Sequence, residues 1–350
     1  MENGNKQCGA SCCGGGQRKA APTVRPGIRK AAGVVPVVDA RLTLSDRCGG
    51  WKVRLGIGRG RYRIEPGLYA LGVPDSESPV LVTANYKLTF DSLRKELSGL
   101  DAWILVLDTH GINVWCAAGK RTFGTAELVR RIESSGLQER IGHRRLILPQ
   151  LGATGVAGHE VKRLTGFQVV YGPVRARDIK QFLADGMKAT PEMRRVRFGI
   201  KDRLAVVPTE LGGVAKYVLL FLVVSAAWHF VRGTLTLRAL APLNVMLIGA
   251  ALAGTLFVPA LLPWIPFRSF ALKGWLLGVV WAVAAGMIYD VGPAGFAGIL
   301  LLLPAISAFL ALNFTGSTTF TSQTGVNKEI RLFARPIAVS AILGIVLMVF

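Results

Sequence analysis

The residues best suited to chemistry lie in one short stretch, Asp108-Thr-His-Gly-Ile-Asn-Val-Trp-Cys-Ala-Ala-Gly-Lys120. The apolar run before it, residues 103–108, predicts a buried strand, so the stretch lies where a strand passes into a helix. In open α/β sheets this carboxyl edge is where ligands bind. The stretch contains Cys116, and thiolates are ligands that soft metal ions prefer. Composition alone favours an inert core thiol, because free cysteines are among the most buried residues.

Two common interpretations of such a stretch fit poorly. The pair Gly119 and Lys120 resembles the end of a phosphate-binding loop, but Val114 stands where that motif needs its first glycine. Arg121 also replaces the Ser or Thr of that motif. The four histidines have no metal-ligand spacing, and no Cys-x-x-Cys run is present to hold an iron-sulfur cluster. The sequence therefore argues against a nucleotide-binding loop and against a cluster of its own.

Two blocks carry a resemblance to a known family. The octapeptide Asn113-Val-Trp-Cys-Ala-Ala-Gly-Lys120 resembles the cap-helix motif of the corrinoid protein of microbial mercury methylation, the HgcA family. The run Val80-Leu-Val-Thr-Ala-Asn-Tyr-Lys-Leu-Thr89 is similar to the matching strand and loop of that family and of the corrinoid iron-sulfur protein large subunit. The resemblance covers roughly residues 40–350, and the octapeptide is its specific part.

The resemblance implies a site for a cobalamin-type corrinoid held with its own base displaced. It makes Cys116 the lower axial ligand of the cobalt and the catalytic residue. The small residues after the cysteine would let the cap helix lie flat against the macrocycle. The other residues that shape the cap are Asn113, Val114, Trp115, Ala117, Ala118, Gly119 and Lys120.

Two further places are candidates for contact with the corrinoid. Thr83 and Asn85 follow an apolar run, where they either hydrogen-bond the corrinoid or form a turn that caps the next helix. The glycine-rich segment 150–158, with Gly152 and Thr154, is expected to accommodate the nucleotide tail of the corrinoid.

The resemblance implies methyl transfer from methyl-cobalt to inorganic Hg(II), producing methylmercury. Because Hg(II) is an electrophile, the methyl group must leave with its bonding electrons, and a thiolate on the opposite side of the cobalt donates the electron density that favours this. A ferredoxin-like partner with two [4Fe-4S] clusters is implied as the electron donor. A methyl-tetrahydrofolate pathway is implied as the methyl source.

Two other functions stay open. One is a membrane corrinoid methyltransferase with a different methyl acceptor, and the other is a basic membrane anchor without a cofactor. Nucleic-acid binding is not expected, because no basic run is interleaved with aromatic residues as a base-stacking surface would be. The formal net charge of +21 is explained instead by a basic domain beside an anionic leaflet of membrane lipid.

The elements that must position these residues alternate between strands and helices. This predicts an α/β corrinoid-binding domain with a mostly parallel sheet flanked by helices. The strands are expected at residues 79–83, 103–108, 145–149 and 167–171, and the helices at residues 89–97, 125–134 and 176–184, with Thr125 as an N-cap.

The last third of the chain predicts an all-α transmembrane domain of five spans. The spans are expected at residues 214–231, 240–262, 270–289, 293–313 and 333–350, of which the first and last are short. Residues 37–212 then form the corrinoid-binding domain and 213–350 the membrane domain. Residues 1–36 are expected to be a disordered basic tail, whose Cys8, Cys12 and Cys13 either bind a soft metal or have no function.

The expected location is the cytoplasmic (inner) membrane, multi-pass, with the N-terminal domain in the cytoplasm. The first forty residues lack the apolar segment of a signal peptide, and the five cysteines suggest no disulfide framework. The cations of the expected loops are also unevenly distributed. Arg268, Lys273, Lys328, Arg331 and Arg335 fall on the side of the N-terminal domain, against Arg232 and Arg238 on the other, which agrees with the positive-inside rule.

Overall fold

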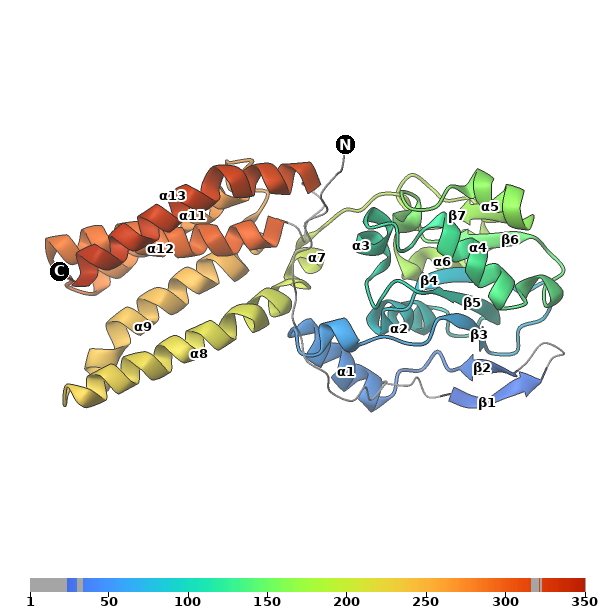
Figure 1. The fold of residues 1–350 in the computed structure, drawn as a ribbon, viewed down its shortest axis with the longest axis horizontal. Helices are drawn as coiled ribbons and strands as arrows, with labels where there is room; N and C mark the ends of the chain where they lie inside the picture. The colour runs from blue at the N-terminus through green and yellow to red at the C-terminus, as the bar shows by residue number, and fades with distance from the viewer. Residues whose placement is uncertain (1–23, 30–33, 316–320, 322, 350) are drawn as a thin grey trace, which may run out of the picture. The chain divides into compact units, whose positions relative to one another are not determined.

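The computed structural model describes residues 24–29, 34–315, 321 and 323–349, and these form two compact units (Figure 1). The first consists of residues 1–46 and 60–194, and the second of residues 47–59 and 195–350. Cys8, Cys12 and Cys13 lie outside the described residues. Their role in the tail stays a prediction, as does the domain boundary expected at residue 212.

A seven-stranded sheet forms the centre of the first unit, in the order β1-β2-β3-β5-β4-β6-β7. Strands β5, β4, β6 and β7 pair in parallel, whereas β3 is antiparallel to β5. At the other edge β2 is parallel to β3 and antiparallel to β1. The sheet is therefore mostly parallel, as predicted. The strands are β1 (Val24–Arg29), β2 (Val34–Val38), β3 (Gly67–Leu71), β4 (Val80–Ala84), β5 (Ala102–Leu107), β6 (Arg145–Leu148) and β7 (Gln168–Tyr171).

Helices cover both faces of this sheet, so the unit has three layers. Alternate residues of a strand point to opposite faces. Leu105 and Leu107 of β5 accordingly share a core with α3, α4 and α5. Ile104 and Val106 share the other core with α2 and α6. The helices are α1 (Leu44–Arg54), in which the chain passes into the second unit, α2 (Lys87–Glu96), α3 (Val114–Gly119), α4 (Thr125–Ser134), α5 (Gly158–Thr165) and α6 (Ile179–Ala184).

Every strand and helix predicted between residues 79 and 184 is confirmed. Their ends lie within two residues of those expected, except that α6 begins at Ile179 after a 3₁₀ turn at Ala176–Asp178. Two details differ. Gly124 is the N-cap of α4 and Thr125 its first residue. The Thr125 hydroxyl instead accepts the N–H of Ala157, the N-cap of α5, at 2.9 Å. Strands β1 and β2 also begin within residues 1–36, where a tail without structure was expected, since valines there supply a pairing edge.

A buried cluster of four charged side chains fixes α2 within the first unit. The Lys87 ammonium lies 2.5 Å from an Asp46 carboxylate oxygen and 2.6 Å from an Asp91 oxygen. Arg94 donates to both carboxylates at 2.8 Å. Burial raises the pKa of Asp46, but hydrogen bonds from Lys87 and Thr43 outweigh it and hold this pKa well below its usual range. The charges of the two acids and the two bases therefore neutralise one another inside the protein.

The described residues of the second unit form five helices long and apolar enough to cross a membrane, which confirms the predicted number. They span Ile200–Val231, Leu237–Leu261, Phe270–Ile288, Gly292–Phe314 and Thr324–Met348. The first and last are longer than expected, because polar turns continue the helix before each apolar stretch. The helical elements are α7 (Ile200–Leu204), α8 (Val207–Val231), α9 (Leu237–Leu252), a π-helix (Ala253–Phe257), α10 (Val258–Leu261), α11 (Phe270–Ile288), α12 (Gly292–Phe314) and α13 (Gln323–Val349).

Small residues let the helices of this unit pack closely around α12. A Cβ added at Gly274 would lie 2.4 Å from the Ser307 carbonyl, and one at Gly278 would lie 2.5 Å from the Pro304 Cα. Close backbone approach of this kind is typical of helices in membranes. Lys273 was expected in a loop but lies buried in α11. Its ammonium donates to the Leu262 carbonyl at 2.5 Å. Close helix packing and backbone capping thus accompany two buried hydrophobic clusters in this unit.

Replacing Lys87 by Ala is expected to destabilise the first unit by about 3–5 kcal/mol, because it leaves two buried carboxylates without their ammonium partner. Hydrogen–deuterium exchange of the β4 and β5 amides in the full chain measures this loss. Lys95→Ala is the matched control, since Lys95 pairs with Glu96 on the surface and such pairs contribute at most about 1 kcal/mol. Equal protection in both variants would contradict a stabilising role of the buried cluster.

Candidate functional site

The amide of Asn85 organises the loop that follows β5. Its Oδ1 accepts three hydrogen bonds, from the Thr109 N–H at 3.1 Å, the Thr109 hydroxyl at 2.9 Å and the Gly111 N–H at 2.9 Å. Its Nδ2 donates to Asp108 at 3.0 Å. Asn85 is buried at the end of β4, so one side chain ties that end to the loop after β5. Asn85 does not cap α2, because Tyr86 is its N-cap and no side chain bonds there. The predicted contact of Asn85 with the corrinoid stays a prediction.

The loop reaches α3 through a tight left-handed turn. His110 and Gly111 have φ values of 57° and 75°, and Arg121 after the helix has a φ of 62°. Glycine adopts the φ of Gly111 without strain, and an added Cβ there would only make an ordinary contact with the Arg63 Cβ at 3.4 Å. The segment between these turns is therefore held at both ends by backbone conformations that few residues adopt.

The cap octapeptide forms the one-and-a-half turns of α3 and begins with Asn113. The Asn113 side chain accepts the Cys116 N–H at 2.9 Å, which makes it the N-cap of the helix. An asparagine at this position satisfies a backbone donor that the helix itself leaves unpaired. The backbone of Cys116 is thus held in place by the side chain of Asn113, a residue of the same motif.

The residues of α3 divide between two faces. Val114, Ala117 and Ala118 are buried in the core of the first unit. Trp115 and Cys116 are exposed on the other face, and Trp115 keeps 38% of its surface accessible. Gly119 and Lys120 complete this exposed face, which we call the cap face. A Cβ added at Gly119 would meet no atom within 4 Å, so the space beside the thiol is open.

The two alanines have a different role from the predicted one. They were expected to lie against the macrocycle, but both point into the core, away from the cap face. Their small size lets the backbone of α3 approach the segment beneath it, where a Cβ added at Gly155 would lie 3.0 Å from the Ala118 Cα. Of the small residues after the cysteine, Gly119 alone is on the cap face.

The glycine-rich segment lies beneath α3 and supports it. Gly152 is buried in a short 3₁₀ turn, and an added Cβ would lie 2.5 Å from the Phe123 ring. At Gly155 an added Cβ would lie 2.1 Å from the Phe123 carbonyl. Thr154 is exposed between them. The glycines are therefore required by packing against Phe123, while Thr154 alone presents a polar group to solvent.

Glu127, in the first turn of α4, supports the same loop from its other side. Its carboxylate accepts the Asp108 N–H at 2.8 Å and is paired with Arg131 at 2.7 Å and with Arg130. Burial raises the pKa of Glu127, but the Asp108 N–H and the two arginines outweigh it and lower the pKa below its usual value. Asp108 is thereby held by Asn85 on its side chain and by Glu127 on its backbone.

Several of these positions were not predicted as site residues. Thr109, Glu127 and Phe123 touch the loop or helix that carries the cysteine, yet none belongs to the octapeptide. Glu127 carries a visible signal, because an acid in the first turn of a helix complements the helix dipole. Thr83, a predicted contact, is buried within β4. No cluster of three or more possible metal ligands occurs among the described residues.

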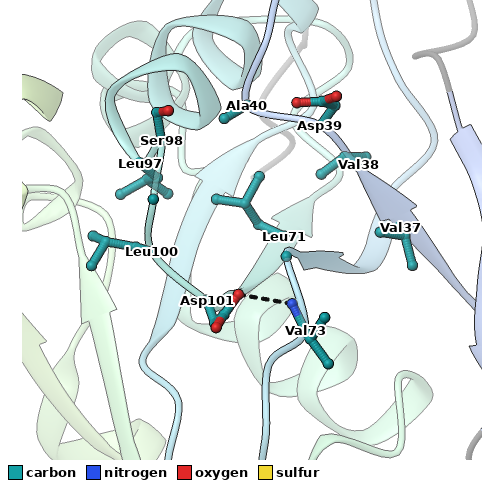
Figure 2. Close-up of a pocket in the computed structure, with 12 residues that line it drawn as sticks. Val37, Val38, Asp39, Ala40, Leu71, Val73, Leu97, Ser98, Leu100 and Asp101 are labelled. Atoms are coloured by element: carbon teal, nitrogen blue, oxygen red, sulfur yellow. Dashed lines mark hydrogen bonds between the residues drawn. The ribbon is translucent and has the colours of Figure 1, made fainter.

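A cavity lies at the opposite edge of the sheet from the cap face. It measures about 590 Å³ and is lined by the ends of β2 and β3 and by residues 97–101 (Figure 2). Asp101 in its wall accepts the Val73 N–H at 2.8 Å. This cavity lies where β5 begins, whereas the cap face follows the end of β5, about 20 Å along the strand. It is therefore separate from the candidate site.

Residues 59–183 match the family described as CO dehydrogenase/acetyl-CoA synthase delta subunit. The acetyl-CoA decarbonylase/synthase complex subunit gamma of Methanopyrus kandleri is 36% identical over 123 residues, 34% of this chain and 26% of that protein. The corrinoid/iron-sulfur protein large subunit of Moorella thermoacetica is 30% identical over 122 residues, 34% of this chain and 27% of that protein. The chain thus spans about a quarter of the length of these relatives, and the matched part contains the cap face.

Replacing Asn85 by Ala is expected to loosen the loop and α3 together, because Thr109 and Gly111 lose their common acceptor. Leaving buried donors unpaired costs about 1–3 kcal/mol, which corresponds to roughly a 5- to 150-fold rise in amide exchange over residues 108–119. Asn113→Ala is the matched control, and its loss of one cap bond is expected to cost about 1 kcal/mol, confined to the first turn of α3. Unchanged exchange at Gly111 in Asn85→Ala would show that the amide does not organise the loop.

The Glu127 contact is expected to weaken in acid. Since its pKa is lowered in the folded chain, the stabilisation is fully present above the unfolded pKa of about 4.3 and is lost as the pH falls through the folded value. Melting curves of wild type and Glu127→Gln should therefore differ most at neutral pH and converge in acid. Glu133→Gln, an exposed site on the same helix, serves as control. A difference for Glu127→Gln that is independent of pH would contradict this.

Proposed function

We propose that the chain is a membrane-anchored corrinoid protein that transfers a methyl group from cobalt to Hg(II), with the Cys116 thiolate as the lower axial ligand. One observation carries the proposal. The cysteine stands exposed on the cap face, at the carboxyl edge of a domain that is similar to a protein named for its corrinoid.

The residues of the cap face fit a flat macrocycle. Cys116 and Gly119 lie one turn apart on the same side of α3, and within the described chain no atom lies within 4 Å of a Cβ added at Gly119. Trp115 offers an exposed apolar ring beside them, and Lys120 a cation at the end of the helix. A larger residue at position 119 would hold a bound ring away from the sulfur. Asn113 and the buried alanines keep the helix in place while its outer face stays free.

The thiolate accounts for the direction in which the methyl group would move. A bound corrinoid would supply a cobalt that carries the methyl group, and Cys116 would hold that cobalt through its sulfur. A thiolate is a strong electron donor, and the electron density that it would give to the cobalt would favour departure of the methyl group with its bonding electrons. Hg(II) is an electrophile and needs a methyl group of that kind. The cap octapeptide, which resembles the HgcA family, supports this acceptor.

The chain would need partners for a full cycle. No group of possible cluster ligands occurs in the part of the chain that the structure describes, so electrons would come from a ferredoxin-like protein with two [4Fe-4S] clusters. A methyl-tetrahydrofolate pathway would supply the methyl group. The five apolar helices would anchor the chain in a membrane. Arg268 before α11 and the cations in the first turns of α13 support a cytoplasmic first unit.

A second candidate is favoured by the names of the relatives. Most of those compared are subunits of an acetyl-CoA decarbonylase/synthase complex, so a methyl acceptor other than Hg(II) is the alternative. The axial ligand would be the same in both cases. Competition between Hg(II) and a thiol or metal-cluster acceptor separates the two.

Cys116→Ala in the full chain is expected to abolish methylmercury formation when it is expressed with the ferredoxin partner in an anaerobe that does not methylate mercury. The purified wild-type chain should also retain corrinoid with a sulfur-ligated absorption spectrum, and the variant should lose that spectrum. Cys48→Ala is the matched control, since Cys48 is the other exposed cysteine among the described residues.

The outcomes separate the parts of the proposal. Equal methylation by wild type and Cys116→Ala would overturn the ligand assignment. A sulfur-ligated spectrum without methylmercury would keep the ligand and favour the other acceptor. A colourless wild-type chain would leave the basic membrane anchor as the function.

A further inference from the structure

Helix α1 presents an apolar face to solvent. Four residues at spacings of four, three and four share one side of it, and we call them the α1 stripe: Leu44, Cys48, Trp51 and Leu55. The Leu55 N–H bonds to the Trp51 carbonyl at 3.1 Å, so the helical turn continues to it. All four are exposed, and Trp51 keeps 65% of its surface accessible. On the opposite side Asp46 and Val53 are buried. The apolar side of a surface helix usually faces the core, so an exposed stripe of this kind marks a surface for a partner.

Cations border the α1 stripe on both sides. With 3.6 residues per turn, Arg47 and Arg54 lie along one border and Lys52 along the other, and all three are exposed. An apolar stripe bordered by basic side chains is typical of helices that lie in the plane of a membrane interface. Trp51, in the middle of the stripe, is a residue type enriched at this level of the bilayer. The pattern of α1 therefore fits a lipid surface.

The α1 helix does not depend on this stripe for its fold. At its start the Thr43 hydroxyl accepts the Asp46 N–H at 3.2 Å, and the Asp46 carboxylate accepts the Thr43 N–H at 3.0 Å. This reciprocal pair satisfies two backbone donors that the helix itself leaves unpaired. At its end the Arg54 carbonyl accepts the Thr209 hydroxyl at 2.8 Å. The side chains of the stripe take part in none of these hydrogen bonds, so the folded helix carries them on its outer side.

Contacts with α8 hold the end of α1 beside the start of the first span. Residues Arg47–Arg59 and α8 belong to the same unit. Besides the hydrogen bond from Thr209, the two backbones lie so close that a Cβ added at Gly212 would lie 2.1 Å from the Leu55 carbonyl oxygen. From Gly212 to the end of α8 at Val231 the helix has about 20 residues, the length that crosses a hydrocarbon core. Gly212, and the end of the α1 stripe with it, would therefore lie near the boundary of that core.

We propose that α1 is an interfacial helix, whose stripe dips into the lipid leaflet at which α8 starts and whose bordering cations lie among the head groups. Continuity with the first span and the cations on both borders favour lipid over a protein as the occupant. The helix precedes residues 59–183, so this role does not come from the family match. It is also independent of the function proposed for Cys116.

Depth-dependent fluorescence quenching of the full chain in phospholipid bilayers tests this, with a fluorophore on Cys48 after the other four cysteines are replaced by serine. The quenchers are lipids with a nitroxide near the head group or near the end of an acyl chain. The shallow nitroxide is expected to quench the Cys48 label at least about twofold more than the deep one, because interfacial helices bury their apolar face only about 5–10 Å deep. In the same background without Cys48, a label at Val223→Cys, exposed in the middle of α8, should show the opposite order. A label at Glu133→Cys, exposed on α4, is the control that neither nitroxide should quench.

Trp51→Glu combined with Leu55→Glu should move the Cys48 label into water, so that it loses most of its quenching by the shallow nitroxide. Both substituted side chains are exposed, so the circular dichroism should match that of the unsubstituted chain. A Cys48 label that neither nitroxide quenches would overturn the proposal, as would quenching that the double variant leaves unchanged. Shielding of the label from iodide in water without quenching by either lipid would also overturn it, and would assign the stripe to a protein or to a second copy of the chain.

Discussion

Three hydrogen bonds to one oxygen of Asn85 determine where the cysteine stands. The oxygen gathers two backbone N–H groups and a hydroxyl from a loop that has turned into the left-handed region, and the nitrogen of the same amide reaches Asp108. A loop between a buried strand and a short helix has few other partners for its donors, and unpaired buried donors are costly. The direction of α3, and with it the position of the thiol, follows from this arrangement.

The same arrangement explains how so short a helix stays folded. A helix of six residues is not stable by itself in water, so α3 depends on its surroundings. Asn113 caps its start, Ala117 and Ala118 join the core, and the backbone at Gly155 lies directly beneath it. Glu127 then fixes the loop from the side of α4. Each of these contacts is made by the inner face or the ends of the helix, and none uses the cap face.

The sequence predicted the architecture well because periodicity reports burial. Apolar runs gave the strands at residues 79–83 and 103–108, and long apolar stretches gave five spans. The octapeptide located the cysteine, but its pattern does not say which face of α3 each residue occupies. Ala118 therefore appeared to face the ligand. Side-chain contacts across the chain, such as that of Asn85 with residues 109–111, leave no periodic signal and appear only once the strands are placed next to one another.

The open cap face has a consequence for the chain before its cofactor arrives. A folded but unloaded molecule presents an exposed thiol beside an exposed tryptophan ring, and soft, thiol-seeking ions bind such sulfurs directly. If Hg(II) is the substrate, it is also a poison of the apoprotein, because mercury bound to the sulfur blocks its approach to cobalt and withdraws the electron density that the thiolate would donate. The order in which corrinoid and mercury bind then matters more than their affinities, because the corrinoid must bind before the metal reaches the protein. Mercury present during synthesis would inactivate new molecules but leave those that already hold the corrinoid active.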